Sequence, residues 1–431
     1  MMRANQTVEW LYGFQSQGIK LGLERISRLM ADLGNPQEAF VVLHVGGTNG
    51  KGSVCHYLSS ILMKGGYRVG TYLSPHIQRL EERFMIGDRC ISMDELDELI
   101  EKVKPIVDDM IREGLTPTFF EVCTALAFLY FKQQHVEYAV VEVGLGGRFD
   151  ATTIVMPVLS IITNVTRDHH AILGDAIEQI AREKAGIIKP NIPVITAANG
   201  SSLDVIKKIA KEVQAPVYDL SEDQWQRTGC DGLTQTFFFQ GRLQEYHVQT
   251  SMMGRHQGEN IALAVFAVEE LQMQGLYLTE QSILEGIQEM KNPGRMEIVG
   301  KHPLVVLDGA HNVAGMTRLV ETLLDDFTYE RLIVILGILS DKDIKEMLPL
   351  LRPQADVIIT TKSESPRAQD PAMLDEMLST LGFKGVRMIT DTVGAAVHKA
   401  QEIARPGDLI CITGSLFTVG EARTALGLTT C

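Results

Sequence analysis

The first two-thirds of the chain alternates between short, nearly uninterrupted apolar runs and longer segments of helical periodicity. The apolar runs span residues 40–45, 68–73, 138–143, 158–165 and 193–198. The helical segments span residues 92–113, 119–133, 175–187 and 202–213. Strands that are apolar on both faces and separated by helices are typical of a parallel sheet covered on both sides. The pattern predicts an α/β domain built on a mostly parallel sheet.

Two later segments have a different pattern. Residues 234–250 resemble a hairpin with its turn near Gly241, which we expect to form a small antiparallel excursion at the edge of the sheet. Helical patterns follow at 259–274 and 282–290, before Pro293 and Gly294. A second alternation then begins, with strand-like runs at residues 304–307, 332–336, 357–361, 386–389 and 409–412. We therefore predict two domains, residues 1–294 and a smaller Rossmann-like α/β domain at residues 295–431.

Length and composition agree with this division. A chain of 431 residues is long for one core, and 45% hydrophobic with 22% charged residues is ordinary for a globular protein. The net charge of −14 argues against a general nucleic-acid or acidic-membrane binder. The six cysteines are scattered and no apolar run is long enough to span a bilayer, so we expect a cytoplasmic protein without a disulfide framework.

A glycine-rich segment joins the first apolar run to a helical pattern at residues 54–63. Residues 47–53 read Gly-Thr-Asn-Gly-Lys-Gly-Ser. Glycines let backbone N–H groups approach an anion, a helix N-terminus favours negative charge, and Lys51 adds a cation. The segment predicts a phosphate loop for a nucleoside triphosphate; the alternative is an ordinary turn with a solvated lysine. It departs from the common expression G-x-x-x-x-G-K-[ST], because Val45 and Gly52 occupy the first and last positions.

Polar residues also follow other predicted strands, at the edge where open α/β sheets bind ligands. Ser74 ends the second run, Glu142 lies inside the third, and Asp168, His169 and His170 close the fourth. A buried carboxylate needs a cation or a metal, so the cluster suggests a magnesium site, although a histidine ligand for magnesium is unusual. The alternatives are a serine that caps a helix, a structural ion pair between Glu142 and an arginine, and structural histidines.

Three further positions are open to two interpretations. Lys184 lies late in a helical segment, where it could offset the negative end of the helix dipole. Asn312 could cap a helix, and Asp308 could bind a ribose hydroxyl as acids at strand ends do. The glycines at 144–147 do not make a dinucleotide fingerprint, because the last glycine of G-x-G-x-x-G would fall on Phe149.

Together these motifs resemble folylpolyglutamate synthase and the bifunctional dihydrofolate synthase/folylpolyglutamate synthase, which belong to the Mur ligase superfamily. The resemblance runs nearly end to end. Its motifs lie at residues 47–53, 73–76, 141–152, 168–174, 183–187, 256–260, 293–295, 308–312, 341–343, 365–368 and 413–423. The phosphate loop of that superfamily also accounts for the departure from the common expression.

The resemblance implies a role for each matched position. The ATP phosphates would be held by Gly47, Thr48, Asn49, Gly50, Lys51, Gly52 and Ser53. Magnesium would be ligated by Ser74, Glu142 and His169, and a second magnesium ion by a carbamylated Lys184. Asn260 would meet the adenine, and further nucleotide contacts would come from Arg295, Asp308 and His311. The pterin side would be lined by Thr118, Phe119, Phe120, Glu121, Phe149, Asp150 and Ala151.

The implied reaction is an ATP-dependent ligation of L-glutamate to a folate or dihydropteroate carboxylate through an acyl phosphate, with Lys51, Glu142, His169 and Lys184 as the catalytic set. We expect small-molecule substrates, a monomer, and neither nucleic acid nor membrane as partner. Four positions depart from the family pattern: Gly46, Glu81, Thr153 and Asn292. None is a metal or phosphate ligand, so the departures concern substrate preference.

Two rival interpretations remain. A peptidoglycan Mur ligase would need a separate N-terminal nucleotide-sugar domain, and the stretch before the first strand is too short for one. A non-catalytic ATP-binding homologue would keep the fold but lose the chemistry. The presence of Lys51, Glu142, His169 and Lys184 argues against it.

Overall fold

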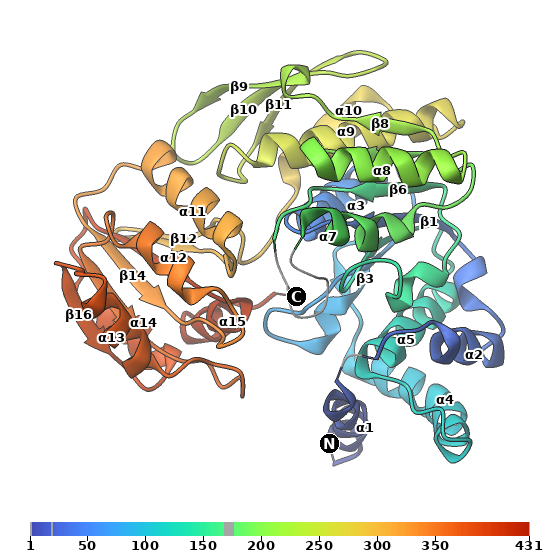
Figure 1. Ribbon diagram of the computed structural model, residues 1–431, viewed down its shortest axis with the longest axis horizontal. Helices are drawn as coiled ribbons and strands as arrows, with labels where there is room; N and C mark the ends of the chain where they lie inside the picture. Colours follow the sequence, from blue (N-terminus) through green and yellow to red (C-terminus); the bar gives the residue numbers. More distant parts are fainter. Residues whose placement is uncertain (1, 19, 168–175, 431) are drawn as a thin grey trace.

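The computed structural model describes residues 2–18, 20–167 and 176–430, which form two α/β lobes in succession (Figure 1). The first lobe is built on an eight-stranded sheet of order β4-β3-β2-β5-β1-β6-β7-β8. Its strands are β1 (Val41–Gly46), β2 (Val69–Tyr72), β3 (Phe84–Ile86), β4 (Arg89–Cys90), β5 (Tyr138–Glu142), β6 (Leu159–Ile162), β7 (Val194–Thr196) and β8 (Val217–Asp219). The sheet is parallel from β2 to β8, and the β3–β4 hairpin adds an antiparallel edge.

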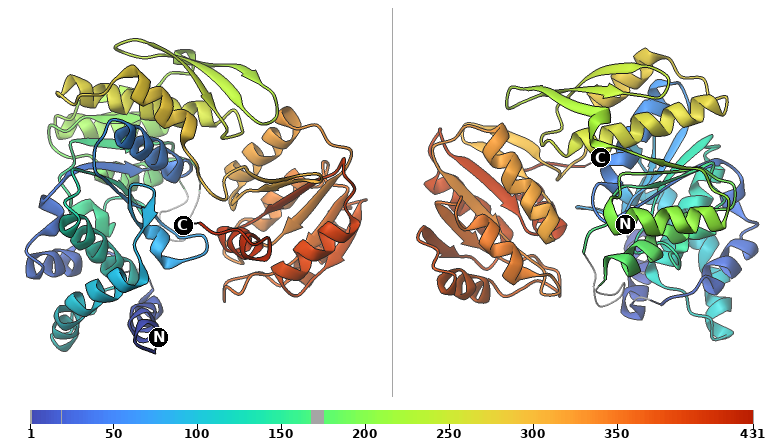
Figure 2. Two further views of the ribbon diagram at one scale, coloured as in Figure 1. Left: turned by 180° about the vertical axis from the view of Figure 1, so that it is seen from behind. Right: turned by 45° about the horizontal axis from the view of Figure 1, so that its top comes forward.

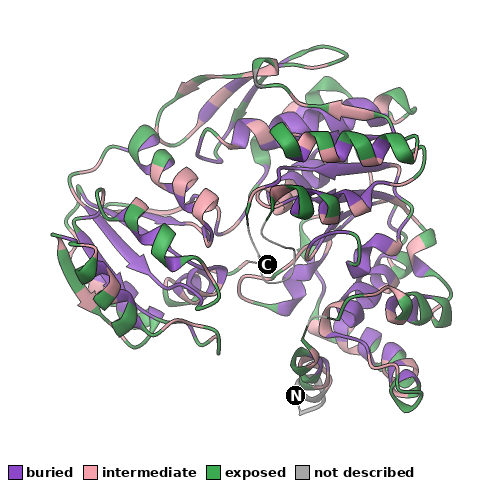
Figure 3. Ribbon diagram, viewed as in Figure 1, coloured by how far each residue is buried: buried purple, intermediate pink, exposed green. Residues whose placement is uncertain are grey.

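Alternate side chains of the central strands enter two separate cores. Val42, Ala139 and Val141 pack under one layer of helices: α1 (Met2–Gly13), α2 (Glu24–Asp32), α4 (Met93–Arg112) and α5 (Phe119–Gln133). Leu43 and Val140 pack under the opposite layer: α3 (Lys51–Lys64), α9 (Gln257–Met273) and α10 (Glu280–Glu289). The far end of the sheet is covered by α7 (Ile177–Lys184) and α8 (Gly200–Glu212). Burial on both faces explains why these strands are apolar throughout (Figure 3).

The second lobe repeats the plan on a smaller scale. Its sheet has the order β12-β13-β17-β14-β15-β16, with only β12 antiparallel. The strands are β12 (Glu297–Lys301), β13 (Leu304–Leu307), β14 (Leu332–Leu336), β15 (Val357–Thr360), β16 (Val386–Ile389) and β17 (Leu409–Thr413). One face carries α11 (Val313–Asp326), α12 (Ile344–Leu351) and α13 (Pro371–Thr380), and the other carries α14 (Val393–Ile403) and α15 (Leu416–Ala425).

The two lobes touch through the end of the chain as well as through the linker near residue 294 (Figure 2). Helix α15 lies against the loop that follows β2, where Gln78 Nε2 donates to Thr424 Oγ1 and to the Leu428 carbonyl, both at 3.0 Å. Gly420 makes this approach possible, because a Cβ there would lie 2.0 Å from the Ile77 carbonyl oxygen. The loop after β2 is therefore held by both lobes.

The α/β class is confirmed, and the expected strands and helices appear within a few residues of their predicted bounds. The hairpin forms its turn at Gly241, but its placement at the edge of the large sheet was wrong. With β9 (Trp225–Cys230), the strands β10 (Gln235–Gln240) and β11 (Glu245–Thr250) make a separate sheet. Its apolar face, with Phe237 and Phe239, packs on the α9 side of the first lobe, because alternating strands can bury only one face.

Two composition-based expectations have different outcomes. None of the described helices combines the length and apolar character needed to cross a bilayer. Among the described cysteines, Cys55, Cys123, Cys230 and Cys411 are free, as scattered cysteines suggested. Cys90 is disulfide-bonded, which the spacing did not predict. Cys90 lines the same cavity as Thr430, so tertiary proximity to the end of the chain sets its environment.

The packing of α10 on α3 provides a test of the first lobe. A Cβ at the helical Gly286 would lie 2.5 Å from the Ile61 Cα, whereas a Cβ at the helical Gly394 meets nothing within 4 Å. Both alanine substitutions gain about 1 kcal/mol of helix propensity. Only Gly286→Ala also overpacks the interface between the two helices, which costs about 1–3 kcal/mol. We expect Gly286→Ala to lower the free energy of unfolding and Gly394→Ala to leave it equal or higher, in urea titrations followed by circular dichroism. Equal effects of the two changes would contradict this packing.

Candidate active site

The predicted phosphate loop lies between β1 and α3, as expected. Gly47 and Gly50 have φ angles of 135° and 84°, which side chains rarely adopt, and a Cβ on Gly50 would lie 2.3 Å from Asn260 Oδ1. The loop is held from β6 and the segment after it: Thr48 N donates to the Asn164 carbonyl at 2.8 Å, and Thr163 Oγ1 donates to the Asn49 carbonyl at 2.7 Å. The backbone at the N-terminus of the 14-residue helix α3 is thus positioned before any ligand arrives.

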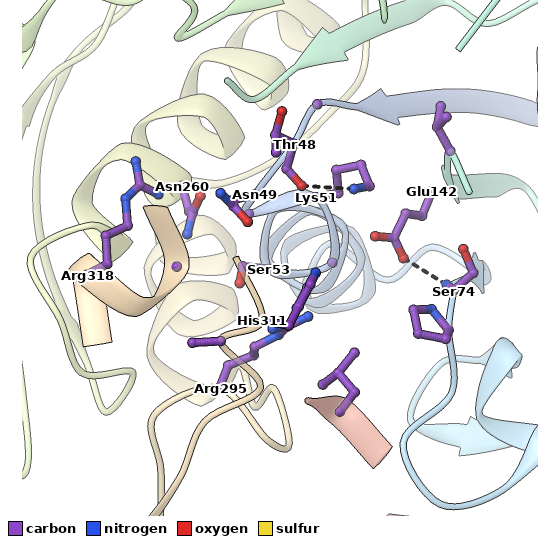
Figure 4. A pocket seen from close by; sticks show the side chains of 18 of the residues that line it. Thr48, Asn49, Lys51, Ser53, Ser74, Glu142, Asn260, Arg295, His311 and Arg318 are labelled. Atoms are coloured by element: carbon purple, nitrogen blue, oxygen red, sulfur yellow. Dashed lines mark hydrogen bonds between the residues drawn. The ribbon is translucent and has the colours of Figure 1, made fainter. Parts of the chain in front are cut away.

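A cavity of about 180 Å³ opens beside this loop, between the two lobes. Its lining includes the loop residues 47–53, Ser74, Glu142, Lys184 and Asn260 from the first lobe, and Arg295, Asp308, His311 and Arg318 from beyond the linker. Figure 4 shows Ser74 and Glu142 on one side of the α3 N-terminus and Asn260 and Arg318 on the other. Nearly all nucleotide and metal candidates that the structure describes therefore meet in one place.

Glu142 ends β5, next to Val45 of β1 in the parallel register, and is 6% exposed. Its Oε2 accepts a hydrogen bond from the Ser74 backbone N–H at 2.8 Å. Burial raises its pKa, and the positive charge of Lys51 and the Ser74 N–H act against that rise. Within the described residues no arginine pairs with Glu142, so the structural ion pair considered above is wrong.

Ser74 does not cap a helix. The chain after Ser74 and Pro75 has no helical turn until residues 80–83, so that alternative is also wrong. Parallel pairing of β2 with β5 instead brings Ser74 beside the end of β5. Ser74 and Glu142 offer oxygen atoms, the ligand type that Mg²⁺ prefers, and Glu142 Oε1 accepts no hydrogen bond from the described residues. These two residues fit a magnesium ion; His169, the third predicted ligand, lies outside the described residues.

Lys184 is the last residue of α7 and is buried, 4% exposed. Its Nζ donates to the Gly47 carbonyl at 2.7 Å, so the side chain crosses to the phosphate loop and does not remain at its own helix end. The helix-dipole interpretation of Lys184 is therefore wrong. Lys51 Nζ donates to the Thr48 carbonyl at 3.1 Å, which leaves two of its three ammonium protons for other acceptors.

The second lobe approaches the loop with its own polar groups. Asp308 follows β13, and its two oxygens accept from the Met296 and Ala310 backbone N–H groups, each at 2.9 Å. Burial raises the Asp308 pKa, and the charge of Arg295 opposes the rise. Asn312 caps α11 as predicted and also donates to Asn49 Oδ1 at 3.1 Å, a contact between the lobes that the sequence did not reveal.

Two buried polar atoms of this cavity have no partner among the described residues, Asn49 Nδ2 and Asn260 Oδ1. A buried donor or acceptor without a hydrogen bond costs about 1–3 kcal/mol, which a ligand would recover. The residues thus fit a polar ligand that spans the cavity. Arg318 of α11 also lines it and was missed by sequence reasoning, because one arginine on an amphipathic helix has no distinguishing spacing.

The two segments expected to bind a pterin lie together near the same strand ends. The Phe120 ring packs against Gly144, where a Cβ would come within 2.5 Å of it. Thr118 and Glu121 form a capping box at the start of α5, and Glu121 also pairs with Arg25 at 3.1 Å. Their polar atoms therefore have structural roles that the sequence prediction did not include.

The second of these segments is also ordered by its own side chains. The buried carboxylate of Asp150 accepts from the Leu145 and Thr152 backbone N–H groups, at 2.9 and 3.0 Å. Ala151 is buried, and Phe149 is 37% exposed. Asp150 thus holds the loop after β5 in place. Of these three residues, Phe149 is the one that the segment exposes to solvent.

Comparison with known proteins decides the family. Residues 45–268 match the Mur ligase middle domain, and residues 294–416 match the Mur ligase glutamate ligase domain. This chain belongs to the Mur ligase family. It is 37% identical over 425 residues to the dihydrofolate synthase/folylpolyglutamate synthase of Bacillus subtilis, covering 97% of each chain.

Two solved structures share the fold of this Mur ligase along its length. An Escherichia coli relative in complex with DHPP and ADP has a TM-score of 0.86 at 30% identity, with 98% of this chain and 97% of that chain covered. A bifunctional folylpolyglutamate synthase/dihydrofolate synthase with Mn, AMPPNP and L-glutamate bound has a TM-score of 0.84 at 29% identity, with 98% of each chain covered. The phosphate loop is thus part of an ATP-dependent ligase.

The close approach of Gly50 to Asn260 can be tested against a matched glycine. Gly66 has a similar φ of 88°, but a Cβ there meets nothing within 4 Å. Both alanine substitutions cost about 1–2 kcal/mol, because alanine is strained at a positive φ. Only Gly50→Ala also pushes the phosphate loop away from Asn260. We expect Gly50→Ala to weaken ADP binding by about tenfold or more in calorimetric titrations with magnesium, and Gly66→Ala to leave it unchanged. Equal ADP affinity in both variants would contradict this geometry.

Proposed function

We propose that this Mur ligase joins L-glutamate to the carboxylate of dihydropteroate or a folate, using ATP and an acyl-phosphate intermediate. The observation that carries the proposal is the single cavity that unites the phosphate loop and Glu142 of one lobe with Arg295 and Asp308 of the other. Relatives that match nearly the whole length of the chain have this activity in their names. A carboxylate is a poor electrophile, so one of its oxygens must first be phosphorylated and can then leave as phosphate.

The reaction has two steps. An oxygen of the acceptor carboxylate attacks the γ-phosphorus of ATP, and ADP leaves. The glutamate amine then attacks the acyl carbon, a proton is lost from nitrogen, and phosphate leaves from the tetrahedral intermediate. Lys51 and the N–H groups at the start of α3 offset the charge that develops on the phosphoryl oxygens in the first step.

The metal assignments belong to the proposal. Ser74 and Glu142, with His169, would hold one magnesium ion, and a carbamylated Lys184 would hold a second. Magnesium supplies positive charge beside the transferred phosphoryl group when it is bound. The Glu142 carboxylate and the Ser74 hydroxyl orient this end of the site, because the Ser74 N–H fixes the Glu142 side chain.

The second lobe must exclude water while the acyl phosphate exists, because hydrolysis would waste ATP. The bond between Asn312 and Asn49 and the contact of α15 with the loop after β2 support this closed arrangement. Asn260 on the adenine side, and Arg295, Asp308 and His311 on the side of the second lobe, would bind ATP across the cavity. We further propose that the enzyme acts as a monomer in the cytoplasm, where its small-molecule substrates occur.

Two lysines of one helix give a test of the catalytic assignment. Lys51 begins α3 at the cavity, and Lys64 ends it with an exposed ion pair to Glu289 at 2.6 Å. Lys51→Ala and Glu142→Ala should each abolish ADP formation with dihydropteroate or tetrahydrofolate and glutamate, with native circular dichroism. Lys64→Ala should keep full activity, since exposed ion pairs contribute little. Normal turnover in the folded Lys51→Ala or Glu142→Ala protein would refute the assignment.

Carbamylation of Lys184 has a direct spectroscopic signature. Protein equilibrated with ¹³C-bicarbonate should show a carbamate carbon resonance, which should be missing in Lys184→Arg because a guanidinium does not form a stable carbamate. Turnover of Lys184→Arg should fall by about 100-fold or more, because the charge at this position changes sign. A wild-type spectrum without the resonance would exclude the modification while leaving the ligase reaction intact.

A further inference from the structure

Arg83 is a buried cation that the proposed mechanism does not use. It ends the short helical turn at residues 80–83 and is 7% exposed. Within the described residues, no carboxylate lies within ion-pair distance of its guanidinium, and the only hydrogen bond of its side chain runs from Nε to His76 Nδ1 at 3.0 Å. Its two neighbours in sequence, Glu81 and Glu82, do not supply the charge. Glu82 instead accepts from the backbone N–H groups of residues 77–79.

The Arg83 side chain is largely removed from water, and its charge reaches the Glu142 carboxylate only from beyond ion-pair distance, where it opposes the rise in the Glu142 pKa. The guanidinium therefore keeps the capacity to pair directly with an anion. The two terminal nitrogens of Arg83 make no hydrogen bond to the described protein, and together they form the planar fork that matches a carboxylate. His76 orients this fork. Its Nδ1 accepts a hydrogen bond and so carries no proton, which leaves the ring proton on Nε2 as a further donor.

The position of Arg83 indicates which anion it would bind. Its guanidinium carbon lies 5.4 Å from the centre of the Phe119 ring, on which Tyr12 also stacks with centroids 5.6 Å apart. His76 is two residues beyond Ser74, whose N–H holds Glu142. Arg83 therefore lies between the aromatic segment expected to meet a pterin and the loop that bounds the phosphate end of the cavity. It does not line the nucleotide cavity itself.

We propose that Arg83, oriented by His76, binds the carboxylate of the acceptor substrate and places it for attack on the γ-phosphorus of ATP. This inference rests on the proposed function. Arg83 binds the carboxylate directly, and His76 is a positioning residue. The pair holds the acceptor carboxylate in a fixed position for attack. The entropy of positioning is then lost on binding and no longer adds to the barrier of the chemical step. It also selects acceptors whose terminal group is anionic.

The test compares two ligands of nearly the same size and shape, the anionic dihydropteroate and its neutral carboxamide, by calorimetric titration of the magnesium–ADP complex. Charged hydrogen bonds contribute about 1.5–3 kcal/mol, so the wild type should prefer the carboxylate by about 10- to 100-fold. In Arg83→Gln the affinity for the carboxamide should be unchanged and the preference should fall to about one. Arg83→Lys, which keeps charge but not the fork, should retain a reduced preference.

Arg89→Gln is the matched control, because Arg89 lies nearby in sequence but is exposed and already paired with Glu95 at 2.7 Å. It should keep the wild-type preference. The inference is overturned if the wild type binds both ligands equally, if Arg83→Gln weakens both ligands alike, or if it weakens only ADP. If the wild type binds neither ligand, the proposed function fails. In turnover assays Arg83→Gln should lower kcat/KM for dihydropteroate with little change in the KM for glutamate.

Discussion

The buried carboxylate of Glu142 is the constraint around which the site is arranged. A carboxylate taken out of water needs compensation of several kcal/mol, and here it comes from groups on separate elements of the fold. The Ser74 N–H arrives from the end of β2, Lys51 from the start of α3, and Arg295 from the linker between the lobes. Each of these groups is placed by the parallel sheet or by the closure of the second lobe. The fold therefore determines the electrostatics of the site.

Around the cavity, positively charged side chains outnumber carboxylates, although the whole protein has a net charge of −14. Lys51, Lys184 and Arg295 line the cavity, and Arg83 lies just beyond it, while Glu142 and Asp308 are the carboxylates that face them. A substrate set of nucleotide phosphates and a carboxylate would restore the balance. Local cations of this kind act within about a Debye length, so the overall acidity of the chain does not oppose them.

The second lobe contributes residues to both the nucleotide side and the acceptor side of the site, in addition to excluding water. Asn312 reaches the phosphate loop, Asp308 fixes the turn after β13, and α15 touches the loop that carries His76. One rigid-body movement of this lobe would thus act on the nucleotide and on the acceptor side together. That coupling suits a reaction whose intermediate must be kept from water until the amine arrives.

The sequence alone determined the alternation of strands and helices, the order of the two lobes and the phosphate loop, because these depend on local periodicity and on glycine spacing. It also placed Ser74 and Glu142 at one edge, since parallel strands end together. It did not decide between a catalytic and a structural Glu142 or Lys184, because the choice depends on partners far away along the chain. His169 and the residues around it lie outside the described part.

Only the tertiary structure decided the rest. The separate sheet of β9 to β11, the contact of Asn312 with Asn49, and Arg318 in the cavity all depend on distant segments that meet in space. The same is true of Arg83, which the sequence analysis did not single out and whose lack of an ion-pair partner among the described residues is visible only in three dimensions. Periodicity records which face of an element is apolar, whereas a charge is satisfied or unsatisfied only by the groups that the whole fold brings beside it.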